Sequence, residues 1–232
     1  MVSSGELMFF DLIKDSCDTI FDIGCREDVD YILKSTNKSF HLFEPNPIFY
    51  NACKNKIDGM IGNNIYLNNF GIGNKSETLE YYEDSQSFVK RYVQFTSMSV
   101  PIILSIKRFS EYISENNIDK IDFIKIDTEG CEPDILLDNI EYIKNNVKFI
   151  QFEYASTWLD RKDKMDLSYV LNTYGREFNF YFIYNEEHPV SANNPYILTQ
   201  ISNQKVFDYV KAFMYGGYGF EIALIKRDYD NF

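Results

Sequence analysis

The stretch "DFIKIDTEGCEPDIL", which begins at Asp122, holds the residues of this chain best suited to chemistry. Its first part alternates as a strand does, so that Lys125 and Asp127 share one face. A lysine in a buried strand needs a carboxylate partner, because an unpaired buried ammonium is costly. We therefore expect Asp127 to pair with Lys125 at the carboxyl end of the strand, with Glu153 at the end of the neighbouring strand as another candidate partner. A core ion pair without a catalytic role is the alternative.

Two more acids are expected beside this pair. Glu129 follows two residues after Asp127, and Glu153 ends the apolar run in "FIQFEY". Because the carboxyl ends of parallel strands meet at one edge of a sheet, we predict a catalytic cluster there, made of Lys125, Asp127, Glu129 and Glu153. Such a cluster could position an alcohol and remove its proton, since an alcohol is a poor nucleophile at neutral pH. We assign positioning to Asp127 and the role of base to Glu129, or the reverse.

A divalent cation is the competing account of the same carboxylates. Asp127 and Glu153 could hold Mg²⁺ or another hard cation that acidifies the substrate hydroxyl, with His188 as a further ligand. The nearby acids Glu132 and Asp134 are expected to act only through their charge, on the N-terminus of the following helix.

A second set of residues predicts a nucleotide site. The run "FDIG" places Asp22 and Gly24 at the end of a strand, and Glu44 ends the next strand, 20 residues after Gly24. A glycine here lets backbone amides approach an anion at a helix start. An acid at an offset of about 20 residues can accept the protons of both ribose hydroxyls. The alternatives are a turn-capping role for Asp22 and a solvated loop acid at Glu44.

The elements that must position these residues follow from the hydrophobic pattern. Short apolar strands alternate with amphipathic stretches, which is typical of a parallel sheet with helices on both faces. The predicted strands are Thr19–Ile23, Ser39–Phe43, Ile65–Phe70, Phe123–Asp127, Val147–Glu153, Phe178–Tyr184 and Phe220–Lys226. The predicted helices are Asp28–Lys34, Pro47–Ile57, Lys107–Asn116, Pro133–Asn145, Lys164–Tyr174 and Gln204–Tyr215. A further strand is expected near Thr78–Tyr82, and Asn185–Thr199 is expected to be a polar insertion.

Composition limits the classes of function. The 232 residues, 45% of them hydrophobic, predict one domain, residues 1–232, with a large core. The net charge of -12 disfavours a nucleic-acid substrate, because an acidic surface repels phosphates. Four cysteines without a CxxC motif indicate reduced thiols, and no segment has the length of a membrane span. A soluble, intracellular, cytoplasmic protein is expected, and its oligomeric state stays open.

The segments "TIFDIG", "FHLFEPNP", "NNFGIGN", "IDFIKIDTEGCEPDIL" and "FIQFEY" resemble the FkbM family of S-adenosylmethionine-dependent methyltransferases. The resemblance implies a class I methyltransferase (Rossmann-like) α/β fold with a mostly parallel seven-stranded sheet. It implies O-methylation of a hydroxyl on a sugar, nucleotide sugar or glycan, with S-adenosyl-L-methionine as cofactor. The implied cofactor residues are Asp22 and Gly24 at the methionyl end, Glu44 at the ribose, and Asn69 and Gly71 beside the adenine. Their neighbours Cys25, Arg26 and Pro45 are added to this set.

Two positions depart from the family pattern. Asp28 stands where a second glycine is usual, and Lys107 stands where an acid precedes a long helix. We expect Arg26 to compensate by pairing with the methionyl carboxylate, whereas a surface ion pair with Asp28 or Asp30 is its alternative. A methyltransferase-like binding module that has lost catalysis is the alternative function.

The residues expected on the acceptor side are Ser87, Arg91, Trp158, His188 and Asn194. Their polar and aromatic character suits a carbohydrate or another small molecule. For Trp158 core packing is an equal alternative, and ordinary loop chemistry is the alternative for Asn194. His41, inside the strand "SFHLF", is expected to be a core residue rather than a catalytic one.

Overall fold

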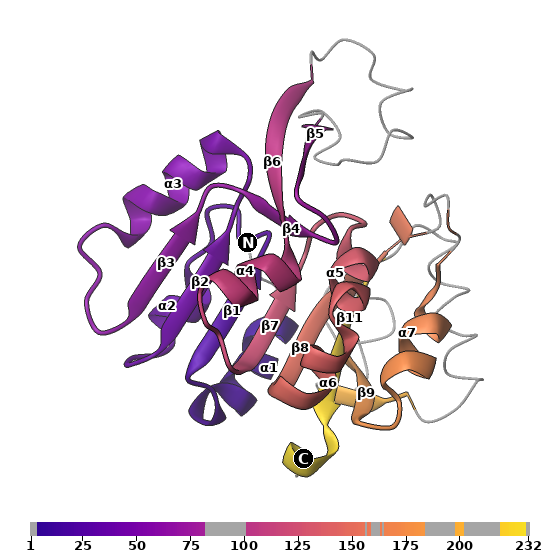
Figure 1. Ribbon diagram of the computed structural model, residues 1–232. Helices are drawn as coiled ribbons and strands as arrows, with labels where there is room; N and C mark the ends of the chain where they lie inside the picture. The colour runs from indigo at the N-terminus through magenta and orange to yellow at the C-terminus, as the bar shows by residue number, and fades with distance from the viewer. Residues whose placement is uncertain are drawn as a thin grey trace.

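The computed structural model describes residues 4–81, 101–155, 157–158, 163, 165–183, 198–201 and 219–230. Within these residues, one central sheet has eight strands in the order β3-β2-β1-β7-β8-β11-β9-β10 (Figure 1). Their bounds are β1 Thr19–Ile23, β2 Ser39–Phe43, β3 Asn64–Asn68, β7 Ile121–Ile126, β8 Val147–Tyr154, β9 Phe178–Ile183, β10 Leu198–Gln200 and β11 Phe220–Lys226. Strands β1, β2, β3, β7 and β8 pair in parallel, whereas β11 is antiparallel to β8 and β9, and β10 to β9.

Helices cover both faces of this sheet (Figure 1). One face packs against α1 (Ser4–Ile13), α2 (Asp30–Leu33) and α3 (Pro47–Ile57), through a core that includes Phe10 and Phe123. The other face packs against α4 (Phe109–Glu115), α5 (Glu132–Asp138), α6 (Ile140–Asn146) and α7 (Leu167–Tyr174), through a core that includes Phe21 and Phe152. Alternate residues of each strand thus enter different cores, as the pleat requires.

A small second sheet stands beyond the carboxyl ends of the central strands (Figure 1). It consists of β4 (Gly71–Gly73), β6 (Ile102–Arg108) and β5 (Glu77–Tyr81), in that order. Strand β4 is parallel to β6, and β5 is antiparallel to β6. Because β4 begins just after β3 ends, this sheet is held close to the edge where the predicted site residues lie.

Several predicted elements are confirmed to the residue. Strands β1, β2 and β11 and helix α3 have the predicted bounds. The start of α3 is well defined because Pro47 lies in the first turn and the Asn46 side chain accepts a hydrogen bond from the Ile48 amide at 2.9 Å. The strand expected near Thr78–Tyr82 is present as β5.

Other predictions need correction. The helix predicted from Lys107 begins at Phe109, because Lys107 and Arg108 end β6. The single helix predicted over Pro133–Asn145 is two helices, interrupted at Asn139, whose φ of -134° is not helical. The sequence did not predict α1, β4, β6 or β10, nor the short 3-10 helices Lys14–Ser16 and Arg227–Tyr229. Strand β10 falls largely inside the predicted polar insertion and gives the central sheet eight strands instead of the expected seven. The predicted helix Gln204–Tyr215 lies outside the described residues. None of the described helices is both long and apolar enough to span a bilayer.

Candidate functional site

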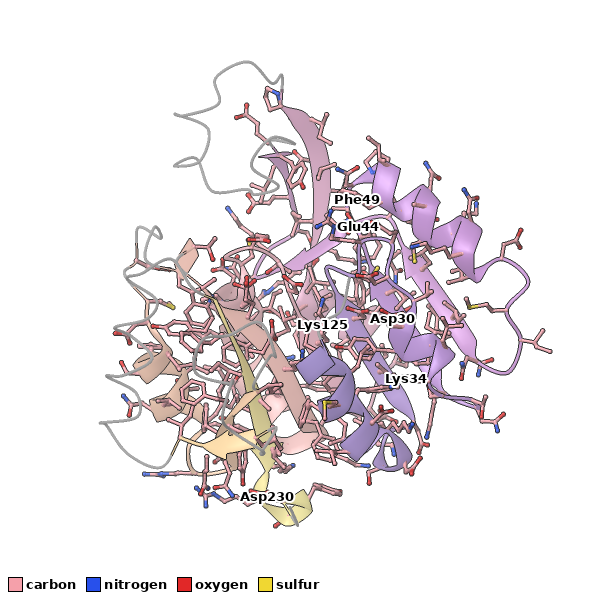
Figure 2. The ribbon with its side chains drawn as sticks, turned by 180° about the vertical axis from the view of Figure 1, so that it is seen from behind. Asp30, Lys34, Glu44, Phe49, Lys125 and Asp230 are labelled. Carbon is pink, nitrogen blue, oxygen red and sulfur yellow. The ribbon has the colours of Figure 1, made fainter. Side chains whose placement is uncertain are left out.

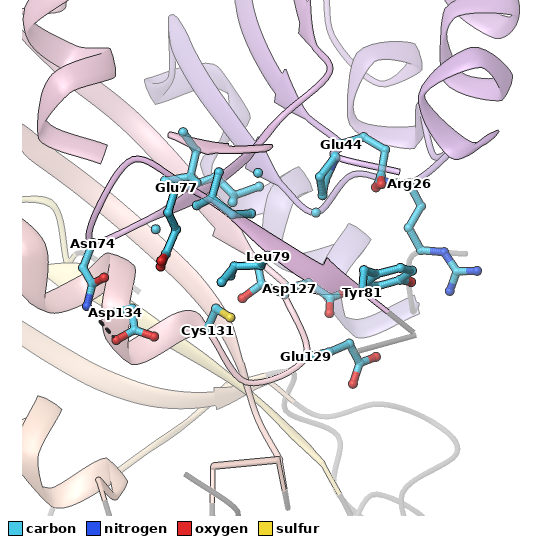
Figure 3. A pocket seen from close by; sticks show the side chains of 18 of the residues that line it. Arg26, Glu44, Asn74, Glu77, Leu79, Tyr81, Asp127, Glu129, Cys131 and Asp134 are labelled. Atoms are coloured by element: carbon cyan, nitrogen blue, oxygen red, sulfur yellow. Dashed lines mark hydrogen bonds between the residues drawn. The ribbon is translucent and has the colours of Figure 1, made fainter. Parts of the chain in front are cut away.

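A cavity opens where β1, β2 and β7 end, between these strands and the small sheet (Figure 3). Its empty volume, part of which is open to solvent, is about 940 Å³. The predicted site residues that line it are Gly24, Arg26, Glu44, Pro45, Gly71, Asp127 and Glu129. The apolar side chains of Phe49, Leu79 and Ile106 contribute further walls. The mixed polar and apolar lining is typical of a small-molecule site.

Gly24 brings the loop after β1 into direct contact with the loop after β7. Its φ is +85°, and a Cβ atom at this position would lie 1.8 Å from the Asp127 carbonyl oxygen. The Gly24 amide donates to the Phe43 carbonyl at 3.0 Å, and the Asp127 amide donates to the Ile23 carbonyl at 2.9 Å. The sequence suggested that the glycine frees amides for a ligand. Its amide is used within the chain instead, and the glycine is required by the close backbone approach.

Glu44 is the acid of the rim next to β2. Its carboxylate is 4% exposed and accepts hydrogen bonds from the amides of Asn46 at 2.7 Å and Arg26 at 3.0 Å. Burial raises the pKa of Glu44 to about 7, and these two amide bonds oppose the rise. The carboxylate is therefore fixed in position, with free lone pairs available toward the cavity.

Asn69 supports the same rim from the end of β3. Its side-chain amide donates to the carbonyls of Glu44 at 3.0 Å and Pro45 at 3.2 Å. Gly71, two residues later, leaves room for its neighbours, because a Cβ atom there would lie 2.8 Å from Ile106 Cδ1 and 3.4 Å from Pro45 Cγ. Asn69 thus braces the loop from behind, whereas Gly71 lines the cavity.

Arg26 lies at the mouth of the cavity. Its φ is +52°, and its guanidinium carbon stands 4.6 Å from the centre of the Phe49 ring. A guanidinium over an aromatic face gains a cation–π attraction. Figure 3 shows Arg26 and Glu129 on the same side of the opening. Cys25, the residue before Arg26, is 2% exposed, and its thiol lies against Cys53 of α3.

The predicted ion pair of Lys125 is present, and it includes a second acid. Lys125 Nζ lies 3.1 Å from Asp127 Oδ2 and 3.7 Å from Asp22 Oδ1. Lys125 lies in the interior of the molecule (Figure 2) and is 5% exposed. Asp22, its register partner on the neighbouring strand β1, is 4% exposed. Burial favours the neutral amine, but the charges of Asp127 and Asp22 outweigh it and raise the pKa of Lys125 well above its usual value.

The acids of the predicted catalytic cluster do converge. One carboxylate oxygen each of Asp127, Glu129 and Glu153 lie within 4.8 Å of one another. Burial, followed by the charges of Asp127 and Glu132, raises the pKa of Glu129 to about 7. Burial, followed by the charges of Asp127 and Glu129, raises the pKa of Glu153 to about 9. A carboxylate that titrates near neutral pH can accept and release a proton under working conditions.

Glu132 has more contacts than the sequence suggested. Its carboxylate accepts hydrogen bonds from the Thr128 amide and hydroxyl, both at 2.8 Å, and from the Gly130 amide at 3.0 Å. The Trp158 indole donates a further bond at 2.9 Å. Trp158 is fully buried, and its ring centre lies 5.7 Å from that of Phe152. Of the two roles expected for it, the structure shows core packing. Spacing alone could not reveal a contact between residues 26 positions apart.

The remaining candidates have simpler positions. His41 is a core residue, as predicted: its Nδ1 lies 2.8 Å from the Tyr112 hydroxyl, and burial lowers the pKa of His41 to about 4. Lys107 forms an ion pair with Glu115 and lies 5.7 Å from the centre of the Phe70 ring. The predicted acceptor-side residues Ser87, Arg91, His188 and Asn194 lie outside the described residues.

One end of the cavity was missed by the sequence reasoning. Asn74 and Asp134 lie there, and the Asn74 side-chain amide donates to Asp134 Oδ1 at 3.0 Å (Figure 3). Glu77 and Tyr81 of β5 also line it. Glu77 and Tyr81 could not be assigned to the site from the sequence, because β5 reaches the cavity only through its pairing with β6 in the small sheet.

The fold of this chain has counterparts among solved structures of methyltransferases. The fold is shared with SMU.1697c of Streptococcus mutans, solved in complex with S-adenosylhomocysteine, at a TM-score of 0.50 and 11% identity over 97% of this chain and 99% of that one. An rRNA methylase from Streptococcus thermophilus aligns at a TM-score of 0.47 and 12% identity over 97% and 98% of the two chains. The fold is that of the class I methyltransferases.

The family follows from sequence. The model of the methyltransferase FkbM domain matches residues 22–188, and this chain belongs to that family of S-adenosylmethionine-dependent methyltransferases. Comparison with curated proteins gives no match.

Proposed function

We propose that this chain is an S-adenosylmethionine-dependent O-methyltransferase that methylates a hydroxyl of a sugar, nucleotide sugar or glycan. The observation that carries the proposal is one cavity lined both by Glu44 at the end of β2 and by Asp127 and Glu129 after β7. A ribose-binding acid and a candidate base therefore face the same space.

The residues of the cavity fit the cofactor. The fixed carboxylate of Glu44 can accept both ribose hydroxyls, and the walls at Phe49 and Ile106 suit an adenine ring. The guanidinium of Arg26 offers a partner for the methionyl carboxylate. Gly24 also lines the cavity and, because it has no side chain, takes up no space there that the cofactor would need.

The chemistry assigned to the chain is positioning and proton removal. When bound, S-adenosylmethionine supplies a methyl group on a sulfonium whose leaving group is a neutral thioether. Asp127, held by Lys125 at 3.1 Å, orients the acceptor hydroxyl. Glu129, with a pKa of about 7, takes the hydroxyl proton as the new bond to carbon forms. The apolar walls of the cavity limit the access of competing water.

The acceptor class is supported by charge and by the kind of side chains at the site. A net charge of -12 disfavours a polyanionic acceptor. Carboxylates and amides such as Glu77 and Asn74 on the cavity wall are typical hydrogen-bonding partners of neutral hydroxyls. We therefore place a nucleic acid outside the proposed acceptors.

A divalent cation is a second possibility for the same acids, since Asp127, Glu129 and Glu153 offer oxygens within 4.8 Å of one another. Lys125 already neutralises Asp127, so we favour catalysis without a metal. Turnover that persists in enzyme treated with EDTA would support this preference, and turnover restored only by Mg²⁺ would refute it.

The proposal is tested in two stages. Calorimetry with S-adenosylhomocysteine should give binding that weakens at least about tenfold in Glu44→Ala, because two charge-assisted hydrogen bonds are lost. Nucleotide sugars and free glycans are then screened with a cofactor labelled on its methyl group. Label transfer to a sugar hydroxyl supports the proposal, transfer only to RNA refutes the acceptor class, and no binding of S-adenosylhomocysteine favours the non-catalytic module.

A further inference from the structure

The segment that presents the two catalytic acids has an unusual backbone. Between the end of β7 and the start of α5, Glu129 has a φ of +57° and Gly130 a φ of +112°. Glycine adopts such values freely, but a glutamate does so only when its surroundings hold it there. The segment 127–131 therefore needs an anchor that fixes its shape.

Glu132 supplies this anchor. Its side chain has 0% exposure, and its carboxylate receives hydrogen bonds from the amides of Thr128 and Gly130, which flank Glu129 on both sides. The Thr128 hydroxyl adds another bond at 2.8 Å. Because one carboxylate binds three donors of this short segment, the backbone on both sides of Glu129 is held by Glu132.

Trp158 fixes the anchor in turn. Its indole N–H donates to Glu132 Oε2 at 2.9 Å, and its ring packs in the core 4.9 Å from the Tyr154 ring and 5.7 Å from the Phe152 ring, centre to centre. A carboxylate has about four lone-pair sites, and these donors occupy them. Glu132 is thus committed to acceptor contacts and is not available as the base.

We propose that Glu132 and Trp158 are positioning residues, which hold segment 127–131 in the conformation that directs Asp127 and Glu129 toward the transferred methyl group. This inference rests on the proposed function for its last step. Neither residue needs to touch the cofactor or the acceptor. Trp158, expected from the sequence to contact substrate or to pack in the core, would act on the reaction through Glu132.

The test compares Trp158→Phe with a matched control. Trp158→Phe removes the indole donor and keeps an aromatic ring in the core. Tyr174→Phe, the control, also removes one hydrogen bond of a fully buried aromatic residue, in this case from its hydroxyl to the Leu136 carbonyl of α5. Glu132→Gln is a third variant, in which the side-chain NH₂ group cannot accept from the segment's amides.

The first readout is hydrogen exchange of the Thr128 and Gly130 amides. We expect at least about tenfold faster exchange in Trp158→Phe and in Glu132→Gln, and no change in Tyr174→Phe. The second readout compares S-adenosylhomocysteine with sinefungin, an analogue whose ammonium lies where the sulfonium methyl would be. We expect wild type to prefer sinefungin, and Trp158→Phe to lose about threefold or more of that preference while its affinity for S-adenosylhomocysteine stays within about twofold.

The outcomes separate the two proposals. Unchanged exchange in Trp158→Phe would overturn the positioning inference, as would faster exchange with an unaltered preference for sinefungin. An equal loss of preference in Tyr174→Phe would show that any core defect suffices, and would also overturn it. Wild-type protein that binds neither compound would refute the proposed function, whereas the exchange data would still decide whether Glu132 and Trp158 hold the segment.

Discussion

Removal of Lys125 should produce a stability loss that depends on pH in a specific way. In the wild type, burial raises the pKa of Asp22 to about 6 from an ordinary value of 3.8, although Lys125 opposes the rise. Without Lys125 the pKa of Asp22 rises further, so the folded state keeps this proton while the unfolded state releases it. Lys125→Met keeps an unbranched side chain of similar length and removes the ammonium group, with its charge and its hydrogen bond to Asp127.

The magnitude follows from linkage. A raised carboxyl pKa destabilises the fold by about 1.4 kcal/mol per pH unit between the unfolded and folded pKa values. In the wild type this loss stops growing at about pH 6, which limits the cost of Asp22 to about 3 kcal/mol. In Lys125→Met it continues above pH 6. The free energy of unfolding of the variant should therefore fall further below that of the wild type as the pH rises above 6, by up to about 1.4 kcal/mol per pH unit until the pH passes the higher Asp22 pKa of the variant.

Urea unfolding at pH 6, 7 and 8, followed by the fluorescence of Trp158, measures this difference. Adding Asp22→Asn to Lys125→Met should remove the pH-dependent part, because no carboxyl remains to titrate at that position. A stability difference that is the same at all three pH values would refute the reasoning. So would a pH dependence that survives in the double variant, since it would have to come from another group.

Three further predictions concern the rim of the cavity. Gly24→Ala should lose about 2 to 4 kcal/mol of stability in thermal or urea unfolding, because its Cβ would overlap the Asp127 carbonyl at a positive φ; a loss below about 1 kcal/mol would contradict the close contact. Arg26→Ala should weaken S-adenosylhomocysteine binding about tenfold in calorimetry and Glu27→Ala should not; equal, negligible effects would exclude the role given to Arg26. Turnover should rise about tenfold from pH 6 to pH 8, as Glu129 loses its proton above a pKa of about 7, and should be nearly abolished in Glu129→Gln; a flat pH profile would argue against this base.

The central sheet and the main acids could be predicted from sequence because each depends on local pattern. The strand "TIFDI" is mostly apolar and is followed directly by a glycine, and the acid of "HLFEP" comes directly before a proline, so both strand ends are marked. Because these strands are parallel neighbours in the sheet, Glu44 and Asp127 lie at the same edge of the sheet and line the same cavity.

The rest depends on contacts that no local pattern encodes. Strand β6, "IILSIKR", has the composition of either a strand or a helix start, and only its pairing with β4 and β5 decides between them. Glu132 lies in the first turn of α5, where an acid is expected simply because its negative charge stabilises the helix N-terminus. Its bond to Trp158, by contrast, joins α5 to the segment that follows β8 and could not be read from spacing.

The backbone contact between Gly24 and Asp127 has a consequence for how this enzyme could be redesigned. It joins the loop after β1 and the loop after β7 into a common rigid frame, so a change that moves one loop moves the other as well. The antiparallel strands β5 and β6 lie outside this contact and still contribute Glu77, Leu79, Tyr81 and Ile106 to the cavity wall. Engineering of new acceptor preferences should therefore begin with these two strands, where side chains can be exchanged while the shared frame stays intact.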